Sequence, residues 1–328
     1  MMKRFLPCLL LILLNAACAP VVMPAGLAIM APEMTGDALV MKDGTALTLR
    51  SWLTQDDPRA IVLALHGFND YGNAFALPAA FWADRGIATY AYDQRGFGTS
   101  EIAGFWPGAE TLAWDARAAI ALLVQRHPRT PLYLLGTSMG GAVAAVSVLD
   151  GAPDGLSGLI LVAPAVWGRD TMPWHYQASL WLIAHAAPGM KLSGSGLDLW
   201  PSDNIEMLRD LGRDPLVLKE TRADAVFGLV HLMDDGLASA GEAPLPVLLV
   251  YGENDQIVPP EPVARFAADM SGPVRIAVYP ESYHMVLRDL SREIPLGDIA
   301  SFMLDPAAPL PSGNETGLEA LQALEPAF

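Results

Sequence analysis

A serine at position 138 stands in a segment whose spacing is typical of a nucleophile. The segment Gly136-Thr137-Ser138-Met139-Gly140 has the pattern G-x-S-x-G, follows the apolar run 132–135 and precedes an Ala- and Val-rich stretch. This order predicts a strand, a sharp turn that exposes the serine hydroxyl, and a helix. The helix N-terminus supplies free N–H groups and a partial positive charge beside the serine. The alternative interpretation is an ordinary strand-to-helix turn with a solvent-facing serine.

A serine hydroxyl is a weak nucleophile and needs a base within hydrogen-bonding reach. In sites of this type the chain order is Ser, then Asp or Glu, then His. Of the six histidines, His284 follows the last apolar run of strand type, 274–279, so its loop can reach back to the serine. Asp255 follows the run 247–251 and is the candidate carboxylate that orients the imidazole. Glu253 in the same turn is its competitor.

Attack on an acyl group creates an oxyanion that backbone N–H groups can stabilise. Loss of one such donor typically lowers the rate by about 10²–10³. One donor is expected at Met139, directly after the nucleophile, and the other in the loop after the apolar run 61–65. There Gly67 permits a close approach, so we assign the second donor to the N–H of Phe68. His66 is interpreted as a brace of this loop, because no second metal ligand lies at suitable spacing beside it.

The elements that position these residues follow from an alternation of strand-like and helix-like segments. Short apolar runs without polar alternation indicate strands buried on both faces of a parallel sheet. They lie at 61–65, 87–92, 132–135, 159–162, 247–251 and 274–279. Helical stretches lie at 112–126, 139–149, 262–270 and 290–303. The alternation predicts an α/β fold with a doubly wound, mostly parallel sheet, preceded by an antiparallel hairpin of residues 38–41 and 46–52.

The alternation is interrupted between residues 166 and 242, which are helical in pattern and contain no convincing strand. So long an interruption predicts an inserted helical cap over the carboxyl edge of the sheet. The α/β core then comprises residues 36–165 and 243–305. Residues 306–328 are rich in Pro and Gly, and they predict a disordered tail.

The N-terminus has the pattern of an export signal. A basic start is followed by the apolar run 5–14 and small residues, and this run is too short to span a bilayer. The segment 14–18 resembles a bacterial lipoprotein signal, which implies removal of residues 1–17 and lipid modification of Cys18. We therefore expect an exported lipoprotein, anchored to a bacterial membrane and facing the periplasm, with residues 18–35 as a tether. Plain export and an uncleaved anchor are the alternatives.

The composition excludes several functional classes. Lys and Arg number 20 and Asp and Glu 36, so the net charge of −16 argues against a nucleic-acid binder. A hydrophobic fraction of 52% with 17% charged residues is not that of a disordered chain. The only cysteines, Cys8 and Cys18, lie at the N-terminus, which leaves the body without a disulfide or a cysteine-based metal site. We expect no metal and no cofactor.

Taken together, these segments resemble the monoacylglycerol lipase and lysophospholipase group of α/β hydrolases, also described as serine aminopeptidase-like. The resemblance covers about residues 36–303 and implies an α/β-hydrolase fold with Ser138, Asp255 and His284 as a catalytic triad. It gives Asp93 a structural role in the turn 93–100. The matching segments are His66-Gly67, Tyr92-Asp93-Gln94-Arg95-Gly96-Phe97-Gly98-Thr99-Ser100, Gly136-Thr137-Ser138-Met139-Gly140-Gly141, Gly252-Glu253-Asn254-Asp255 and Tyr283-His284. Asn69-Asp70 departs from the Gly-Glu-His usual in that group.

The expected activity is that of a serine esterase or lipase that works through an acyl-enzyme. Four of the eight tryptophans, at 167, 174, 181 and 200, lie in the predicted cap, together with further apolar residues that include Leu229 and Met233. This apolar surplus predicts a cleft for a medium or long acyl chain. The expected substrate is a lipid ester such as a monoacylglycerol or a lysophospholipid. One alternative is an aminopeptidase or amidase that binds an amine at Asp234-Asp235, and another is a non-catalytic lipoprotein binding module.

Overall fold

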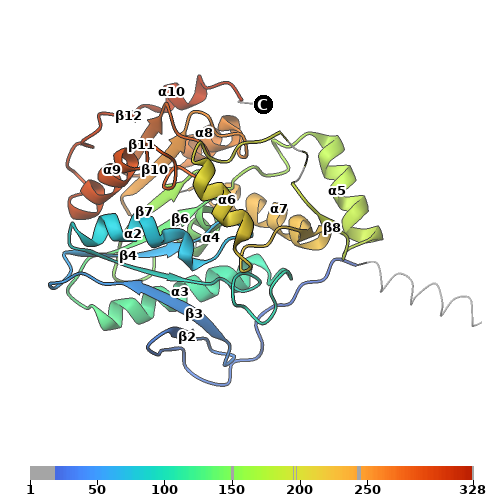
Figure 1. Cartoon of the computed structure of the whole chain (residues 1–328), viewed down its shortest axis with the longest axis horizontal. Coiled ribbons are helices and arrows are strands. Elements are labelled where there is room, and N and C mark those ends of the chain that lie inside the picture. Colours follow the sequence, from blue (N-terminus) through green and yellow to red (C-terminus); the bar gives the residue numbers. More distant parts are fainter. Residues whose placement is uncertain (1–18, 149–150, 195, 197, 242–244, 327–328) are drawn as a thin grey trace, which may run out of the picture.

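The computed structural model describes residues 19–148, 151–194, 196, 198–241 and 245–326. Their main feature is a sheet with helices on both faces (Figure 1). The strands of this sheet are β1 (Glu33–Met34), β2 (Ala38–Val40), β3 (Ala46–Trp52), β4 (Ala60–Leu65), β5 (Ile87–Tyr92), β6 (Leu132–Thr137), β7 (Leu156–Val162), β10 (Val247–Gly252), β11 (Val274–Tyr279) and β12 (Glu315–Thr316).

The strands lie in the order β1-β2-β3-β5-β4-β6-β7-β10-β11-β12. Neighbours from β5 to β11 are parallel, and the strands at both edges pair antiparallel. Every residue of β4, β5 and β10 is buried, as the unbroken apolar runs predict. The parallel sheet and the N-terminal hairpin of β2 and β3 are thus confirmed. The carboxyl ends of β4, β6, β10 and β11 lie at the same edge of the sheet. The candidate residues follow these strands in the sequence and therefore lie at that edge.

Two hydrophobic cores form on the two faces of the sheet. One core packs the sheet against α3 (Ala109–Arg126), α4 (Met139–Val148), α7 (Ala223–Ala238) and α8 (Pro260–Asp269). The other packs it against α2 (Ala76–Ala83) and α9 (Glu293–Leu304). The first turn of α2 follows η2 (Gly72–Phe75), and neither of these two elements is among the expected helices.

The segment between β7 and β10 forms the expected helical insertion, with α5 (Trp174–Ala186), α6 (Ile205–Arg213) and α7. It also contains two short strands that the sequence did not predict, β8 (Lys191–Leu192) and β9 (Thr221–Arg222), which pair antiparallel. Helix α7 packs on α4, where a Cβ on Gly236 would lie 3.2 Å from that of Ala142. This helix therefore completes the core layer, while α5 and α6 lie outside it (Figure 1).

The C-terminal segment differs from the disordered tail that its composition predicted. Strand β12 pairs with β11, and Arg275 donates to both carboxylate oxygens of Glu315 at 2.8 and 2.6 Å. The following helix α10 (Leu318–Gln322) buries Leu321 completely, and Leu310 is 4% exposed. Isolated leucines thus dock a segment whose Pro and Gly content suggests disorder, and the prediction is wrong for residues 306–326.

The N-terminal strap, residues 21–30, also differs from the free tether expected there. Its backbone N–H groups bond to the body at successive points. Val21 donates to Asp224 Oδ2 at 3.2 Å, Met23 to the carbonyl of Trp106 at 2.8 Å, and Ile29 to the carbonyl of Lys42 at 2.7 Å. The signal segment 1–17 and Cys18 lie outside the described residues. No helix among the described residues is long and apolar enough to cross a membrane.

Candidate active site

Ser138 occupies a strained turn between β6 and α4. Its φ is +51°, in the left-handed region that non-glycine residues rarely adopt. The flanking glycines explain how the turn closes. A Cβ on Gly136 would overlap the carbonyl of Gly140, and one on Gly140 would overlap the carbonyl of Leu65. The turn therefore needs both glycines, and its geometry holds Ser138 out at the start of α4.

The helix that follows presents backbone donors at this turn. The Ser138 carbonyl accepts from the N–H groups of Gly141 at 2.9 Å and Ala142 at 3.2 Å, so α4 begins immediately after the serine. The first N–H groups of a helix have no partner within it, and Met139 supplies the first of them. Among the described residues neither the Met139 nor the Phe68 N–H donates a hydrogen bond in the structure. Both amides are free to bind an oxyanion.

Asp255 and His284 are joined as the chain order predicts. Asp255 Oδ2 lies 2.8 Å from His284 Nδ1, and their side chains are 0% and 9% exposed. The other carboxylate oxygen of Asp255 accepts from the N–H groups of Ile257 at 2.7 Å and Val258 at 3.0 Å. The competitor Glu253 is exposed to solvent. Asp255 is therefore the carboxylate that faces the imidazole.

The loop after β4 is braced by His66, which is completely buried. Its Nε2 accepts from the N–H of Gln94 at 3.0 Å, so Nδ1 carries the proton and donates to the carbonyl of Gly67 at 2.8 Å. Burial lowers the pKa of His66 below its ordinary value of 6.5. A neutral imidazole thus holds the turn that presents Phe68. The geometry agrees with a brace, and the described residues contain no cluster of metal-ligating side chains.

Asp93 braces the neighbouring turn. Its carboxylate accepts from the N–H groups of Gly72 and Thr99, each at 3.0 Å, and is paired with Arg50. The turn is tight against this side chain, because a Cβ on Gly98 would overlap the Asp93 carboxylate. Asp93 is 1% exposed and does not line the pocket described next, which agrees with the structural role implied for it.

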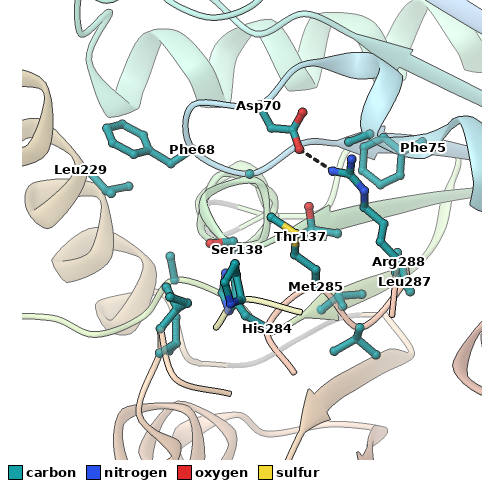
Figure 2. Close-up of a pocket in the computed structure, with 18 of the residues that line it drawn as sticks. Phe68, Asp70, Phe75, Thr137, Ser138, Leu229, His284, Met285, Leu287 and Arg288 are labelled. Atoms are coloured by element: carbon teal, nitrogen blue, oxygen red, sulfur yellow. Dashed lines mark hydrogen bonds and ion pairs between the residues drawn. The ribbon is translucent and has the colours of Figure 1, made fainter. Parts of the chain in front are cut away.

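Ser138 and His284 line one cavity of about 300 Å³ at the carboxyl edge of the sheet (Figure 2). Its walls are mostly apolar. Phe75, Val162, Pro201, Leu229, Met233, Ile257, Val258 and Met285 contribute to them. Among the described residues of the predicted cap, Pro201, Leu229 and Met233 are the ones that take part. The cap tryptophans do not line the cavity, and Trp174, Trp181 and Trp200 are exposed instead. The prediction of an apolar cleft is therefore wrong for the tryptophans, whereas Leu229 and Met233, which belong to the same apolar surplus, do line the cavity.

One ion pair in the wall of the cavity was not anticipated. Asp70 Oδ2 accepts from Arg288 Nη1 at 2.7 Å, and the two side chains are 13% and 16% exposed (Figure 2). Asp70 belongs to the loop of Phe68, and Arg288 to the loop of His284. The pair therefore ties together the two loops on either side of the serine. A separation of 218 residues leaves no local pattern that could have revealed it.

The comparisons with known proteins agree with this architecture. Residues 56–291 match the model of one protein family, described as serine aminopeptidase S33. The chain belongs to this family. Its relatives include the monoacylglycerol lipase of Mycolicibacterium smegmatis, which is 28% identical over 277 residues, or 80% of this chain and 94% of that protein. The human monoglyceride lipase is 24% identical over 234 residues, or 67% of this chain and 73% of that protein.

Solved structures share the fold. A soluble variant of monoglyceride lipase from Saccharomyces cerevisiae, in complex with a substrate analog, has a TM-score of 0.68 and 20% identity, covering 88% of this chain and 98% of that one. A carboxyl esterase from Bacillus coagulans, in complex with glycerol, has a TM-score of 0.65 and 20% identity, covering 83% and 96%. The fold is that of the α/β hydrolases. Its family and its lipase relatives make the enzyme a carboxylic ester hydrolase.

Proposed function

We propose that the enzyme hydrolyses its ester through an acyl-enzyme on Ser138, with His284 as the base and Asp255 as the group that orients it. The observation that carries this proposal is the 2.8 Å bond between Asp255 and His284 beside a serine held at a φ of +51° in the same cavity. Because Asp255 is bonded to Nδ1, Nε2 is the ring nitrogen of His284 that remains to accept the serine proton. The arrangement supplies each role that acyl transfer needs.

The proposed reaction has two stages. Ser138 Oγ attacks the ester carbonyl carbon, and its proton passes to Nε2 of His284. The N–H groups of Met139 and Phe68 stabilise the oxyanion of the tetrahedral intermediate. Collapse breaks the bond to the alcohol, which leaves with the proton from His284. A water molecule then attacks the acyl-enzyme and gives a proton to His284. The bond between the acyl carbon and Ser138 Oγ breaks, the proton returns from His284 to Oγ, and the carboxylic acid is released.

We further propose that the substrate is a monoacylglycerol or a similar lipid ester. The mostly apolar cavity walls suit an acyl chain, and the relative from Mycolicibacterium smegmatis is named a monoacylglycerol lipase. Arg288, the one cation among the described lining residues, is already paired with Asp70. The phosphate of a lysophospholipid would have to compete with the Asp70 carboxylate for Arg288. The cavity therefore favours a substrate with an uncharged head group.

The experiment that tests the activity is covalent labelling with a fluorophosphonate, followed by hydrolysis of p-nitrophenyl esters of increasing chain length. The wild-type enzyme should be labelled, and Ser138→Ala should be neither labelled nor active. Octanoate should be preferred to acetate because its chain fills the apolar cavity. Absence of labelling would favour a non-catalytic binding module. A strong preference for acetate would contradict the lipid ester.

The aminopeptidase alternative finds less support. It needs a free carboxylate to bind the amine of a peptide, and Asp234-Asp235 is the candidate. In the structure Asp234 forms an ion pair with Arg169 and accepts from its backbone N–H at 2.6 Å. Neither Asp234 nor Asp235 lines the cavity. Hydrolysis of aminoacyl p-nitroanilides at a rate comparable to that of the octanoate ester would reverse this preference.

For the location we propose a lipoprotein, exported and anchored to the membrane through Cys18 so that the enzyme faces the periplasm. The exposed aromatic face of α5 supports it, because Trp174 is 77% and Trp181 55% exposed, and such residues favour a membrane interface. The strap begins beside this helix. Val21 bonds to Asp224, whose N–H donates to the carbonyl of Pro188, just after α5. Mass spectrometry of the N-terminal peptide tests the lipid, and Cys18→Ala should release the enzyme from membranes.

A further inference from the structure

A second buried carboxylate lies close to His284 and has no part in the proposed chemistry. Asp289 is 0% exposed. Its Oδ2 accepts from the N–H of Tyr283 at 2.7 Å, and its Oδ1 accepts from the hydroxyl of Ser202 at 2.5 Å. Tyr283 directly precedes His284, whereas Ser202 belongs to the segment inserted between β7 and β10. One side chain thus connects the insertion to the loop of the base.

The backbone is held on both sides of His284. Before it, the N–H of Tyr283 bonds to Asp289. After it, the N–H of Met285 donates to the carbonyl of Pro201 at 2.9 Å. The N–H of Asp289 donates to the carbonyl of Met285 at 3.1 Å. Residues 283–289 therefore form a closed loop that carries His284, and Pro201 and Ser202 bond to this loop from the insertion.

Further bonds join the cap segment, residues 200–204, to the same loop. Asn204 Nδ2 donates to the carbonyl of Arg288 at 3.0 Å, and the N–H of Leu290 donates to Asp203 Oδ1 at 2.9 Å. At the other end, the N–H of Trp200 donates to Gln256 Oε1 at 2.8 Å, next to Asp255 in the chain. The cap segment is thus bonded to the loops of both the acid and the base.

The chemistry of Asp289 indicates a defined position rather than an incidental contact. Burial raises the pKa of this carboxyl above its ordinary value, and the donors Ser202 and Tyr283 oppose that rise. A buried carboxylate must keep such donors, because an unsatisfied charged group in the interior costs far more than the bond itself contributes. Its position therefore fixes the positions of both partners.

We propose that Asp289 is a positioning residue, which joins the cap segment to the loop of His284 and so sets the direction in which the imidazole faces Ser138. This inference rests on the proposed function, in which His284 is the base. It follows that the cap segment not only contributes Pro201 to the cavity wall but also takes part in forming the catalytic geometry. The position of the insertion on the core then affects the rate of the chemical step.

Four variants of the full-length enzyme test the proposal: Asp289→Ala, Asp289→Asn, Ser202→Ala and the control Asp298→Ala. Asp298 is matched because it is also 0% exposed and accepts from a tyrosine hydroxyl (Tyr279, 2.8 Å) and a backbone N–H (Ser312, 2.9 Å). It lies on α9 and does not line the cavity. Each variant is measured for kcat and KM with p-nitrophenyl octanoate, for the rate of fluorophosphonate labelling, and for Tm.

Asp289→Ala should lower kcat and the labelling rate by about 10- to 100-fold with little change in KM, since small misplacements of a catalytic group have effects of this size. Asp289→Asn should recover most of kcat, because its amide oxygen still accepts from Tyr283. Ser202→Ala should reduce kcat by about tenfold, as it removes only one anchor. Asp298→Ala should lower Tm but leave kcat within about threefold of the wild type, because it lies away from the site.

Wild-type kcat and labelling in a folded Asp289→Ala protein would overturn the proposal, and so would a loss of kcat no larger than that of Asp298→Ala. If Asp289→Ala does not fold, Ser202→Ala decides, and an unchanged kcat in that variant would overturn it. Failure of the proposed function is recognised separately. In that case the wild-type enzyme itself is not labelled, or Ser138→Ala is labelled as well.

Discussion

Asp255 Oδ2 lies 2.8 Å from Nδ1 of His284, although 29 residues separate the two side chains in the sequence. The second oxygen of Asp255 is held by the N–H groups of Ile257 and Val258. The carboxylate therefore cannot rotate away from the imidazole without losing these bonds. The pair is oriented before any substrate binds, which is the condition for rapid general-base catalysis.

Replacement of Asp255 by Asn should lower kcat by about 10³- to 10⁴-fold while KM changes little. The Asn side chain can donate to Nδ1, which moves the ring proton to Nε2 and prevents it from accepting the serine proton. Steady-state kinetics with an octanoate ester measure the effect. Glu253→Gln is the control, because this exposed side chain makes no contact with His284. A fall of less than tenfold in Asp255→Asn would contradict the role given to Asp255.

The turn that carries Ser138 should not tolerate a side chain at Gly136. A methyl group there would overlap the carbonyl of Gly140, so Gly136→Ala should lose activity and be destabilised by about 3 kcal/mol or more. Gly297 in α9 is the matched position, since a Cβ there meets no atom within 4 Å. Gly297→Ala should stabilise the protein by about 0.5–1 kcal/mol. Urea unfolding and ester hydrolysis of both variants provide the comparison.

The buried His66 should make the protein less stable in acid. Burial lowers the pKa of this imidazole in the folded state below its ordinary value of 6.5. The unfolded chain therefore takes up the proton first as the pH falls. The contribution of His66 to stability is complete above pH 6.5 and is lost progressively below it, by at most about 1.4 kcal/mol per pH unit.

Urea unfolding at intervals between pH 5 and pH 7.5 measures this dependence. Burial also lowers the pKa values of His127 and His231, so the wild-type slope contains contributions of the same sign from these groups. His66→Asn should retain those contributions and lose that of His66, which leaves a shallower slope. An identical slope in the variant and the wild type would show that His66 is not responsible.

The ion pair of Asp70 and Arg288 should stabilise the protein only as a complete pair. Arg288→Met leaves the Asp70 carboxylate without its cation in a mostly apolar cavity wall, with the N–H of Tyr71 still donating to it at 2.9 Å. We expect a loss of about 2–3 kcal/mol, less than for a fully buried pair because both side chains keep some exposure. Adding Asp70→Asn should recover part of this loss. A double-mutant cycle by urea unfolding measures the coupling, and strictly additive effects would mean that the two side chains do not interact.

Much of the fold could be predicted because its strands are buried on both faces. Such strands are mostly apolar, so β5 stands out in the sequence with the same bounds as in the structure. The bounds of β11 also match, although this strand is only partly buried and its run is interrupted by Arg275. The turn of Ser138 could be found because steric crowding demands glycine on both sides of it. The order of serine, acid and base follows from the order of the strands. These features are local, and a single sequence records them.

Other features depend on contacts that leave little local trace. The N-terminal strap bonds mainly through backbone N–H groups, which all residues except proline possess, so its side chains do not reveal the docking. Asp289 looks like a solvated turn residue until Ser202, 87 positions earlier, is placed beside it. Trp174 and Trp181 were expected to line the cavity but are exposed. The sequence does not distinguish these outcomes, because an apolar side chain in a cap can face outward as well as into a cavity.

The N-terminal strap has a consequence for how the enzyme meets its surroundings. Residues 21–30 are bonded to the body along their length, so this segment does not act as a flexible linker. If Cys18 carries the proposed lipid, the strap keeps the side of the protein where α5 ends turned toward the membrane. A lipid that leaves this membrane would then approach the cavity of Ser138 and His284 from one constant direction.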